Sequence, residues 1–437
     1  MDKPPLKILL SAYSCGPGRG SEPGVGWNAA LAMSTLCEVH VLTTHEFKVD
    51  IERLMADRSL PPTLHFHFFD IPGGPWWWRH GKGRGIQFHY ALWQWMAGKV
   101  VRNLHRIIHF DAAQHVTLVR YWAPSCLRNS GIPYVFGPVA GADLPPKSLI
   151  REYPLRQRMV FAARRLARWM GERNPATLAT LRNAAHVFAA TPATLERCRV
   201  LGVMEGRLSL CQAIGLCEED IKRLAVMPFV KEPVFFGIGQ LRYYKRYDLA
   251  IRAFAAAAIP GSRLVLIGGG PEETKLRNLA ALLGVADRLE ITGFLTRTHA
   301  LAKMAECSVM LHPSNLESGG SAVMEALAAG RPVIALDIGG PALLLDESRG
   351  MKLVPSNSES IVDGMVAAMR TLVDPALRSS MRENARRFAS DGVSWPCKAK
   401  VYVQTLHAVR RSSSGLGRHA LHCLSKNRLD GQLRRIV

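Results

Sequence analysis

Two carboxylates, separated by seven residues, lie in a short segment of this sequence, Ser314 to Ala335. The two acids are Glu317 and Glu325. The pattern around them predicts a loop, a helix from about 321 to 329 and a buried strand from 332 to 336. Glu317 would then precede the helix, and Glu325 would lie about one turn inside it. Ordinary helices also favour acids near their amino ends, because the helix dipole is positive there.

An anion can bind at the start of this predicted helix. Gly319, Gly320 and Ser321 supply backbone N–H groups at the positive end of the dipole, where helical N–H groups lack partners within the helix. One carboxylate can lie beside such an anion, while the other reaches hydroxyl groups of the same ligand. Two acids and an anion site in one segment therefore favour a ligand that carries both phosphate and sugar.

The segment resembles the paired-glutamate motif of the retaining family 4 glycosyltransferases, which have the GT-B fold. The resemblance rests on the spacing of the two acids and on the Ala-Leu-Ala-Ala-Gly-Arg-Pro-Val-Ile-Ala that follows them. It implies that Glu317 is a catalytic residue that positions the donor sugar and its diphosphate. It also implies that Glu325 binds ribose hydroxyls and that Gly319, Gly320 and Ser321 hold the diphosphate of a nucleotide-sugar.

A basic loop at 239–248 follows another predicted strand. Lys245 in this loop can neutralise a diphosphate leaving group, on which negative charge grows in the transition state. Basic loop residues are usually only solvated, so the signal alone is weak. The loop is similar to the family stretch Gly-Arg-Leu…Lys-Gly, which implies that Lys245 is catalytic and binds the donor diphosphate. Gln240 stands where arginine is typical, and Arg242 or Arg246 is the substitute that we expect.

Two further glycine segments, 264–271 and 291–295, resemble family segments around the nucleoside. As bare glycine loops they also fit simple turns. The resemblance implies that Gly293 and Leu295 contact the donor.

The first half of the chain contains Gly18-Arg-Gly-Ser-Glu-Pro-Gly-Val-Gly-Trp27, a glycine-rich loop that we expect to open a helix at about Trp27. Its backbone can approach a phosphate closely. It does not fit the dinucleotide pattern G-x-G-x-x-G, because Pro23 occupies the third glycine position. It is similar to the first loop of a glycosyltransferase subgroup with Gly-Ser-Glu-Pro-Gly-x-Gly-Trp, as are residues 114–124 and 136–141. The similarity implies a donor contact at Gly20.

His115 follows a predicted strand at 112–116, at the end where ligands of parallel sheets bind. The resemblance implies that this histidine is a catalytic residue that contacts the donor sugar. The alternative is a histidine that is packed and hydrogen-bonded inside the fold.

Strands that alternate with helices predict an α/β protein with two Rossmann-like, doubly wound domains that face a central cleft, and the resemblance implies that this is the GT-B fold. We expect an acceptor-binding domain at 1–225, a linker at 226–233 and a nucleotide-sugar-binding domain at 234–395. A helix at 396–411 would pack back toward the first domain, and a basic, loosely ordered tail would follow at 412–437. The predicted strands are 7–13, 38–43, 64–69, 112–116, 133–136, 186–190, 234–239, 263–268, 289–292, 309–312 and 332–336. The predicted helices outside the motif are 27–35, 248–257, 272–283 and 298–306.

Charge is the unusual feature of the composition. The chain has 56 basic and 35 acidic residues among 437, a net charge of +21, and its 48% hydrophobic content excludes a disordered protein. Such an excess of positive charge implies an anionic partner: nucleic acid, lipid headgroups or phosphorylated substrates. The nine cysteines show no metal-ligand spacing, which favours free thiols in the cytoplasm. No apolar run approaches the ~18 residues of a bilayer span.

Two segments could bring the chain to an anionic membrane. Residues 146–173 are basic and helical in period, with an apolar face that includes Met159, Leu166 and Met170. Trp76 to Trp78 form an indole cluster among cations, and tryptophan favours the membrane interface. A solvated cationic helix is the alternative for the first segment.

Together these features predict a retaining hexosyltransferase that uses a nucleotide-sugar and acts at the inner face of the cytoplasmic membrane. Its acceptor would be a glycan, carried by a polyprenyl diphosphate, in bacterial polysaccharide or exopolysaccharide biosynthesis. We expect no metal, no cofactor beyond the donor and no nucleic acid. A basic nucleic-acid-binding protein and a GT-B nucleotide-sugar epimerase are the alternatives.

Overall fold

The computed structural model describes residues 5–73 and 85–413. The predicted Trp76–Trp78 cluster and nearly all of the predicted basic tail lie outside these residues. The chain divides into two compact units. The described part of the first unit comprises 5–73, 85–142, 162–215 and 395–413, and that of the second comprises 143–161 and 216–394.

A parallel sheet of seven strands forms the centre of the first unit, in the order β3-β2-β1-β4-β5-β6-β7. The order reverses between β1 and β4, which lie side by side. The strands are β1 (Lys7–Ser11), β2 (Glu38–Thr43), β3 (Leu64–Phe68), β4 (Ala112–His115), β5 (Tyr134–Val139), β6 (His186–Ala189) and β7 (Leu208–Leu210).

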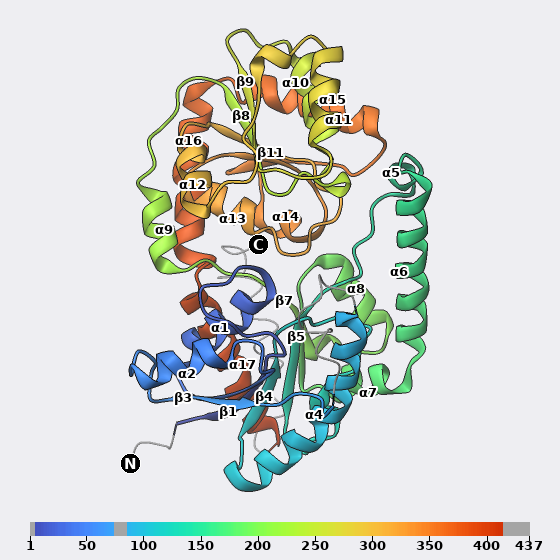
Figure 1. Ribbon diagram of the computed structural model, residues 1–437, viewed down its shortest axis with the longest axis vertical. Coiled ribbons are helices and arrows are strands. Elements are labelled where there is room, and N and C mark those ends of the chain that lie inside the picture. Colours follow the sequence, from blue (N-terminus) through green and yellow to red (C-terminus); the bar gives the residue numbers. More distant parts are fainter. Residues whose placement is uncertain (1–4, 74–84, 414–437) are drawn as a thin grey trace. The chain divides into compact units, whose positions relative to one another are not determined.

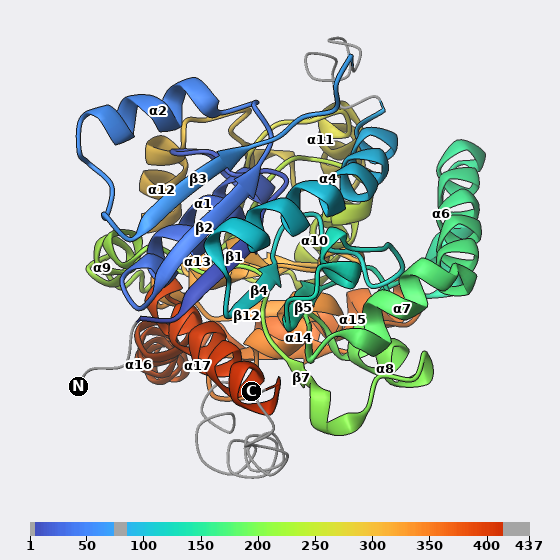
Figure 2. The same ribbon diagram turned by 90° about the horizontal axis from the view of Figure 1, so that it is seen from below.

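Alternating side chains of these strands supply two separate cores. Ile8 and Leu10 pack with α1 and α17, whereas Leu9 packs with α4 on the other face (Figure 2). The strands are short apolar runs, as expected for a sheet that helices cover on both faces. The helices of this unit are α1 (Ser21–Ser34), α2 (Lys48–Ala56), α4 (Ile86–Ile108), α7 (Pro175–Asn183), α8 (Pro192–Val200) and α17 (Trp395–Ser413).

The second unit has six parallel strands in the order β10-β9-β8-β11-β12-β13 (Figure 1). Counted along the chain this is 3-2-1-4-5-6, the Rossmann order, and it reverses between β8 and β11. The strands are β8 (Val234–Ile238), β9 (Arg263–Ile267), β10 (Leu289–Ile291), β11 (Val309–His312), β12 (Val333–Leu336) and β13 (Gly350–Leu353).

Helices α10, α11 and α15 enclose the main core of the second unit together with alternate strand residues such as Phe235, Leu264 and Ile334. Helix α6 (Leu155–Arg173) begins among residues of the second unit and ends among residues of the first. The other helices are α5 (Lys147–Arg151), α9 (Glu218–Ala225), α10 (Tyr247–Ala257), α11 (Glu273–Leu282), α12 (Arg297–Ala305), α13 (Ser321–Ala328), α14 (Gly339–Leu344), α15 (Ser358–Thr371) and α16 (Pro375–Gly392).

The predicted class, with two Rossmann-like α/β domains, is confirmed. The division between the units falls after Gly215 and not at 226–233, because the polar stretch before that predicted linker forms α9 within the second unit. Residues 143–161 also belong to the second unit. Helix α17 belongs to the first, and its Tyr402 and Leu406 are buried in the same core as Ile8.

Helix α1 begins at Ser21, six residues before the predicted start at Trp27. Pro23 does not prevent this, since the first helical turn needs no proline N–H. Gly24 and Gly26 are required by close packing: a Cβ atom at Gly26 would lie 2.3 Å from the carbonyl oxygen of Ser14. The glycine-rich loop is therefore largely helix.

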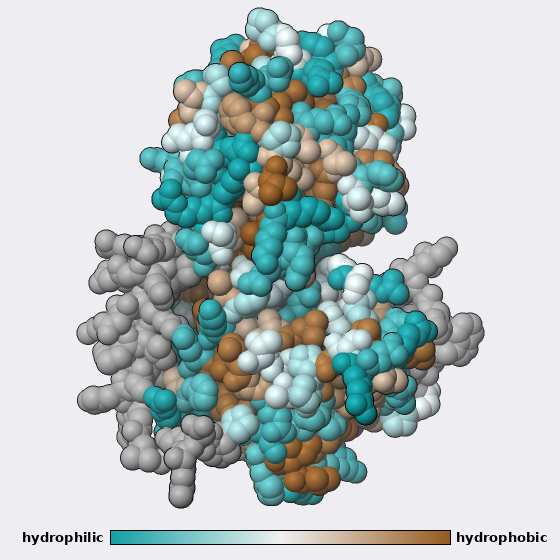
Figure 3. All heavy atoms as spheres, turned by 90° about the vertical axis from the view of Figure 1, so that its left-hand side faces the viewer, coloured by the Kyte–Doolittle hydropathy of each residue, from teal (hydrophilic) through white to brown (hydrophobic). Residues whose placement is uncertain are grey.

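Surface polarity is mixed on the face drawn in Figure 3, where hydrophilic residues are interspersed with smaller hydrophobic groups. No helix in the described ranges is both long and apolar enough to cross a bilayer. The eight cysteines among these residues are free thiols.

Candidate active site

Ligands of doubly wound sheets bind beyond the carboxyl ends of the strands, where the strand order reverses. In the second unit this point lies between β8 and β11. The loop after β8 carries Lys245, and the loop after β11 carries Glu317. The two loops are joined directly, since the Asn315 N–H donates to the Tyr244 carbonyl at 3.1 Å.

Lys245 and Glu317 form a close ion pair at this point. The distance from Lys245 Nζ to Glu317 Oε2 is 2.5 Å, and both side chains are largely buried. Glu317 Oε1 accepts the Gly320 N–H at 3.1 Å. Burial alone would raise the pKa of Glu317, but the Lys245 ammonium and the Gly320 N–H outweigh it and hold that pKa well below its ordinary value. The site therefore contains an ionised carboxylate and an ammonium group.

The helix start beside Glu317 has the predicted form. Gly320 precedes α13 with a φ of 72°, which only glycine adopts freely, and Ser321 is exposed in the first turn. Gly319 and Gly320 are buried. The first backbone N–H groups of α13 lack partners within the helix and lie next to Lys245 and Glu317. The Gly320 N–H is already donated to Glu317 Oε1, and anion binding at this helix start stays a prediction.

Three positioning residues in this region were missed by the sequence reasoning. Gly339 and Gly340 hold the Glu317 backbone: Gly340 N–H donates to its carbonyl at 3.0 Å, and a Cβ atom at Gly339 would lie 1.7 Å from the same oxygen. His312 ends β11, and its Nε2 lies 3.8 Å from Glu317 Oε2. Burial and the Lys245 ammonium lower the pKa of His312 to about 3, so the ring is neutral. Its position at a strand end, just before the acidic loop, was the available signal.

Glu325 lies inside α13 and is held by an arginine. Glu325 Oε1 is 2.6 Å from Arg297 Nη1, and Arg297 also contacts Asp220 at 2.9 Å. Burial raises the pKa of Glu325 despite this guanidinium. A ribose hydroxyl at Glu325 would have to share the carboxylate with Arg297 or displace it, so the predicted ribose role remains a prediction.

The two candidate substitute cations differ in availability. Arg242 is exposed, and its Nε donates to Gln240 Oε1 at 2.6 Å. Arg246 is buried and pairs with Asp248 at 3.0 Å and Glu152 at 2.8 Å. These ion pairs hold Arg246 within the fold, whereas Arg242 is exposed, and the replacement of the missing arginine by either residue stays a prediction.

Gly293 and Leu295 lie in the loop between β10 and α12. Gly293 has a φ of 70°, and the exposed Phe294 between them packs over Gly269, where a Cβ atom would lie 2.9 Å from the phenyl ring. The two predicted nucleoside loops therefore meet at the carboxyl ends of β9 and β10. Their contact with a donor remains a prediction.

In the first unit, His115 lies inside the core. Its ring is fully buried, with Nδ1 2.9 Å from Ser125 Oγ and Nε2 3.2 Å from the Tyr90 hydroxyl. Burial lowers the pKa of His115 to about 4. Both ring nitrogens are thus engaged, which favours the alternative interpretation, and the predicted sugar contact remains untested.

Gly20 is exposed at the start of α1, with open space where a Cβ atom would lie. The next acid along the chain, Glu22, was not predicted as a site residue, yet its Oε2 accepts the Leu118 N–H at 2.8 Å. This bond joins the first turn of α1, which follows β1, to the loop after β4, at the point of strand reversal in the first unit. The Gly-Ser-Glu-Pro sequence was the available signal for Glu22.

A cavity of about 250 Å³ also lies in the second unit, between residues of α5–α6, the loop after β8 and α11. Arg242 and Arg246 line it, but neither Lys245 nor Glu317 does. We place the candidate site at the ion pair because the strand order, the anion-binding helix start and both charges meet there.

Comparison with known proteins finds a family that the second unit resembles. Residues 220–388 match the model described as "Glycosyl transferases group 1". An exopolysaccharide phosphotransferase of Streptomyces coelicolor is 38% identical over 156 residues, which are 34% of this chain and 16% of that protein. The alpha-D-kanosaminyltransferase of Streptomyces kanamyceticus is 29% identical over 156 residues, 35% of this chain and 40% of the relative. The matched segments thus span less than half of either relative's length.

Among solved structures, Anabaena HepE in complex with UDP superposes with a TM-score of 0.57 and 17% identity, over 92% of this chain and 100% of that one. This similarity establishes the fold that both units adopt. The matched residues 220–388 include Lys245, Glu317 and Glu325. Residues 220–388 are therefore similar to the glycosyl transferases group 1, in a chain whose two units have the GT-B type of fold.

Proposed function

We propose that the protein is a nucleotide-sugar-dependent glycosyltransferase that acts in polysaccharide biosynthesis with retention of configuration. The observation that carries the proposal is the Lys245–Glu317 pair, at 2.5 Å, beside the free N–H groups of α13. The family match over this unit, the exopolysaccharide role in the name of one relative and the UDP bound by HepE support it.

In the proposed reaction the donor binds to the second unit. Lys245 and the Ser321 N–H stabilise the charge that grows on the leaving diphosphate, while Glu317 orients Lys245 and the donor sugar. Glu325 binds the ribose once Arg297 moves aside. The leaving phosphate accepts the proton of the acceptor hydroxyl. The fixed cation and N–H groups neutralise the diphosphate in this proposal, and the donor is a co-substrate with no further cofactor.

We further propose that the acceptor is a lipid-linked glycan and that the protein is cytoplasmic and binds the anionic inner face of the membrane. Helix α6 supports this. Its apolar residues Leu155, Met159, Leu166 and Met170 are 53–69% exposed, and arginines occupy the positions between them. Such a surface matches an interfacial helix that lies on acidic headgroups.

Neither alternative gains support from the comparisons. A nucleic-acid-binding protein leaves the buried Lys245–Glu317 pair without a role. An epimerase needs an acid–base pair that exchanges a proton with substrate carbon, whereas Lys245 and Glu317 are joined to each other in an ion pair.

A ligand screen with matched variants tests the donor site. We expect one of UDP, GDP or ADP to raise the melting temperature of the full chain, because a ligand at 100 times its Kd stabilises the folded state by about 2.7 kcal/mol. Lys245→Ala should abolish that shift. Lys303→Ala, which removes ion pairs with Glu290 and Glu306 at 2.9 Å each in the same unit, is the control and should retain it. A screen in which no nucleotide or nucleotide-sugar shifts the wild-type protein, and none is consumed with glycan acceptors, would refute the proposal.

Vesicle co-sedimentation tests the membrane part separately. The wild-type chain should bind vesicles that contain phosphatidylglycerol and not neutral ones, and Met159→Ser with Leu166→Ser should weaken binding. Leu282→Ser, at a leucine 82% exposed on α11, is the control for loss of an exposed apolar side chain. If the α6 double variant binds these vesicles as well as the Leu282→Ser control does, α6 is not the membrane contact. The transferase proposal would not be affected.

A further inference from the structure

Three histidines and a glutamate share one face at the edge of the first unit's sheet. Glu38 and His40 alternate on β2, and His65 and His67 alternate on β3. His40 lies opposite His65 in the parallel register of the two strands. Since β3 is the edge strand, these side chains lie where the sheet has no further neighbour.

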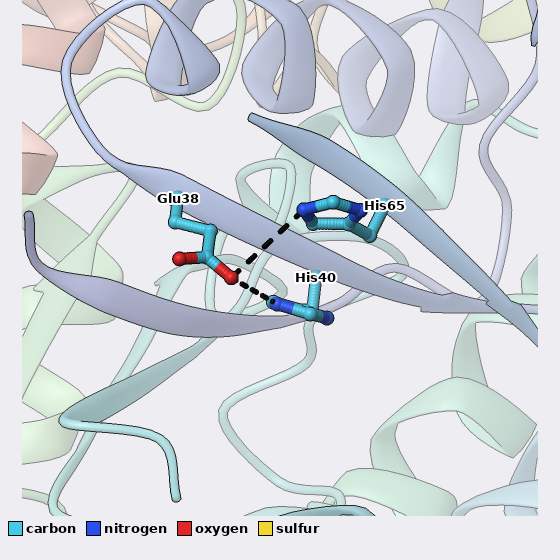
Figure 4. Close-up of side chains that lie close together, drawn as sticks. All are labelled: Glu38, His40 and His65. Carbon is cyan, nitrogen blue, oxygen red and sulfur yellow. Dashed lines mark hydrogen bonds and ion pairs between the residues drawn. The ribbon is translucent and has the colours of Figure 1, made fainter. Parts of the chain in front are cut away.

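The side chains of two of these histidines approach one oxygen atom of the Glu38 carboxylate. Figure 4 shows the imidazoles of His40 and His65 directed toward the Glu38 carboxylate. Glu38 Oε1 is 2.9 Å from His40 Nε2 and 3.9 Å from His65 Nε2. One ligand atom from each residue lies within 4.8 Å of the others, the only such group of three among the described residues. In a tetrahedral zinc site with bonds of 2.0–2.1 Å, ligand atoms are about 3.3 Å apart, between the two observed distances.

We propose that Glu38 Oε1, His40 Nε2 and His65 Nε2 bind a divalent transition-metal ion of the zinc class, with water as the fourth ligand. The donor set favours this chemistry, because imidazole nitrogen combined with one carboxylate suits zinc and its neighbours better than magnesium or calcium. Small side-chain rotations bring the three atoms to equal distances from one ion.

His67 supplies the outer support that such a site requires. His67 Nε2 lies 3.0 Å from His40 Nδ1, on the opposite side of the His40 ring from Glu38. When His40 carries its proton on Nδ1 and donates it to His67, the lone pair of His40 Nε2 faces Glu38. Ligating histidines commonly donate their other N–H in this way, which fixes the tautomer and the ring orientation.

The position of the site indicates a structural role. Glu38 is the first residue of β2 and His65 the second of β3, so the ligands lie toward the amino ends of the strands. The donor-binding loops of parallel sheets follow the carboxyl ends. An ion here would fasten edge strand β3 to β2 and take no part in sugar transfer. His65 is 43% exposed, which leaves an entry path for the ion.

Lys7 provides a specific test of the geometry. Its Nζ lies 3.5 Å from Glu38 Oε1, the same oxygen that we assign to the metal. A bound cation is therefore repelled by Lys7 and competes with it. Lys7→Gln should tighten metal binding roughly threefold or more, because nearby like charges oppose each other even at high effective dielectric.

The experiment uses the full chain, stripped of metal and titrated with Zn²⁺ against a chromophoric chelator. We expect His65→Asn to lower the stoichiometry by one ion and to remove the rise in melting temperature that Zn²⁺ causes. His299→Asn, which alters an exposed histidine on α12, is the control and should match the wild type. An anomalous difference peak at the zinc edge, within bonding distance of Glu38 and His40, would place the ion. Unchanged stoichiometry in His65→Asn, or unchanged affinity in Lys7→Gln, would overturn the proposal.

Discussion

Lys245 and Glu317 are 72 residues apart in the chain and meet because β8 and β11 are neighbours in the sheet. Each residue could be singled out from the sequence, but their pairing could not. The pair is largely buried, so the loss of one partner leaves an uncompensated charge in a poorly solvated place. The two side chains should therefore behave as a unit in catalysis.

Lys245→Met and Glu317→Gln should each lower kcat by about 10²–10³-fold, since each weakens the stabilisation of charge on the leaving group. The double variant should lose much less than the product of the two effects, with a coupling of about 0.5–3 kcal/mol. Steady-state kinetics with the donor found in the ligand screen measures this. Independent, multiplicative losses would show that the pair does not act together.

A substitution at His115 distinguishes a packed, structural histidine from one that contacts the donor sugar. Its ring is hydrogen-bonded on both sides, so His115→Gln should lower the free energy of unfolding by about 1–3 kcal/mol, while donor affinity changes less than twofold. Chemical denaturation and donor titration measure the two effects. Ser125→Ala, which removes one partner of the ring, should give a smaller stability loss of the same kind. A large loss of donor affinity with normal stability would instead establish the sugar contact.

At the scale of elements, the strands were the most predictable part of the molecule. Short apolar runs between turns located β2 and β11 at the residues observed. Helix α4 was not predicted, since Gly98 and several aromatic residues with low helix propensity lie within it, and its packing against the sheet compensates. Strands β7 and β13, of three and four residues, were not predicted.

The part of the candidate site that comes from one continuous segment could be predicted from the sequence. The motif helix, its glycines and its two acids stand together in the sequence, and α13 begins at the predicted residue. The partners Arg297, His312 and Gly339 come from α12, β11 and α14, so tertiary structure decides their contacts. The histidine cluster on β2 and β3 was visible in the sequence as the alternation of His65 and His67. The search for a metal site considered the spacing of cysteines only and therefore missed these histidines.

The start of α1 gives a prediction at this scale. Gly26→Ala would place a Cβ atom 2.3 Å from the Ser14 carbonyl oxygen, so we expect a loss of about 1–3 kcal/mol in unfolding free energy, as for an overpacked core. Gly206→Ala is the control, since no atom lies within 4 Å of its Cβ position and its φ is negative. Equal melting temperatures for the two variants would contradict the close packing of α1.

For the whole molecule, buried neutral histidines tie stability to pH. Burial lowers the pKa of His115 and His186 to about 4, and burial beside Lys245 lowers that of His312 to about 3. An unfolded histidine has a pKa of about 6.5. Between these values the unfolded chain binds more protons than the folded one, so stability rises with pH.

We therefore expect the urea midpoint to fall steadily as the pH drops from 7.5 to 5. Each buried histidine contributes at most about 1.4 kcal/mol per pH unit below its unfolded pKa. His186→Asn should flatten the dependence, whereas His299→Asn, at an exposed ring, should leave it unchanged. A midpoint that stays constant over this range, or that rises on acidification, would show that these rings are protonated in the folded protein.

Helix α17 links the folding of the first unit to the order in which the chain is made. The first unit takes this helix from residues that follow the whole second unit, and Ala399, Tyr402 and Leu406 cover the same core as Ile8 and Leu10. A nascent chain that has emerged as far as residue 394 holds a complete set of strands but an uncovered apolar face. The core of the first unit can therefore be completed only after the second unit has been synthesised.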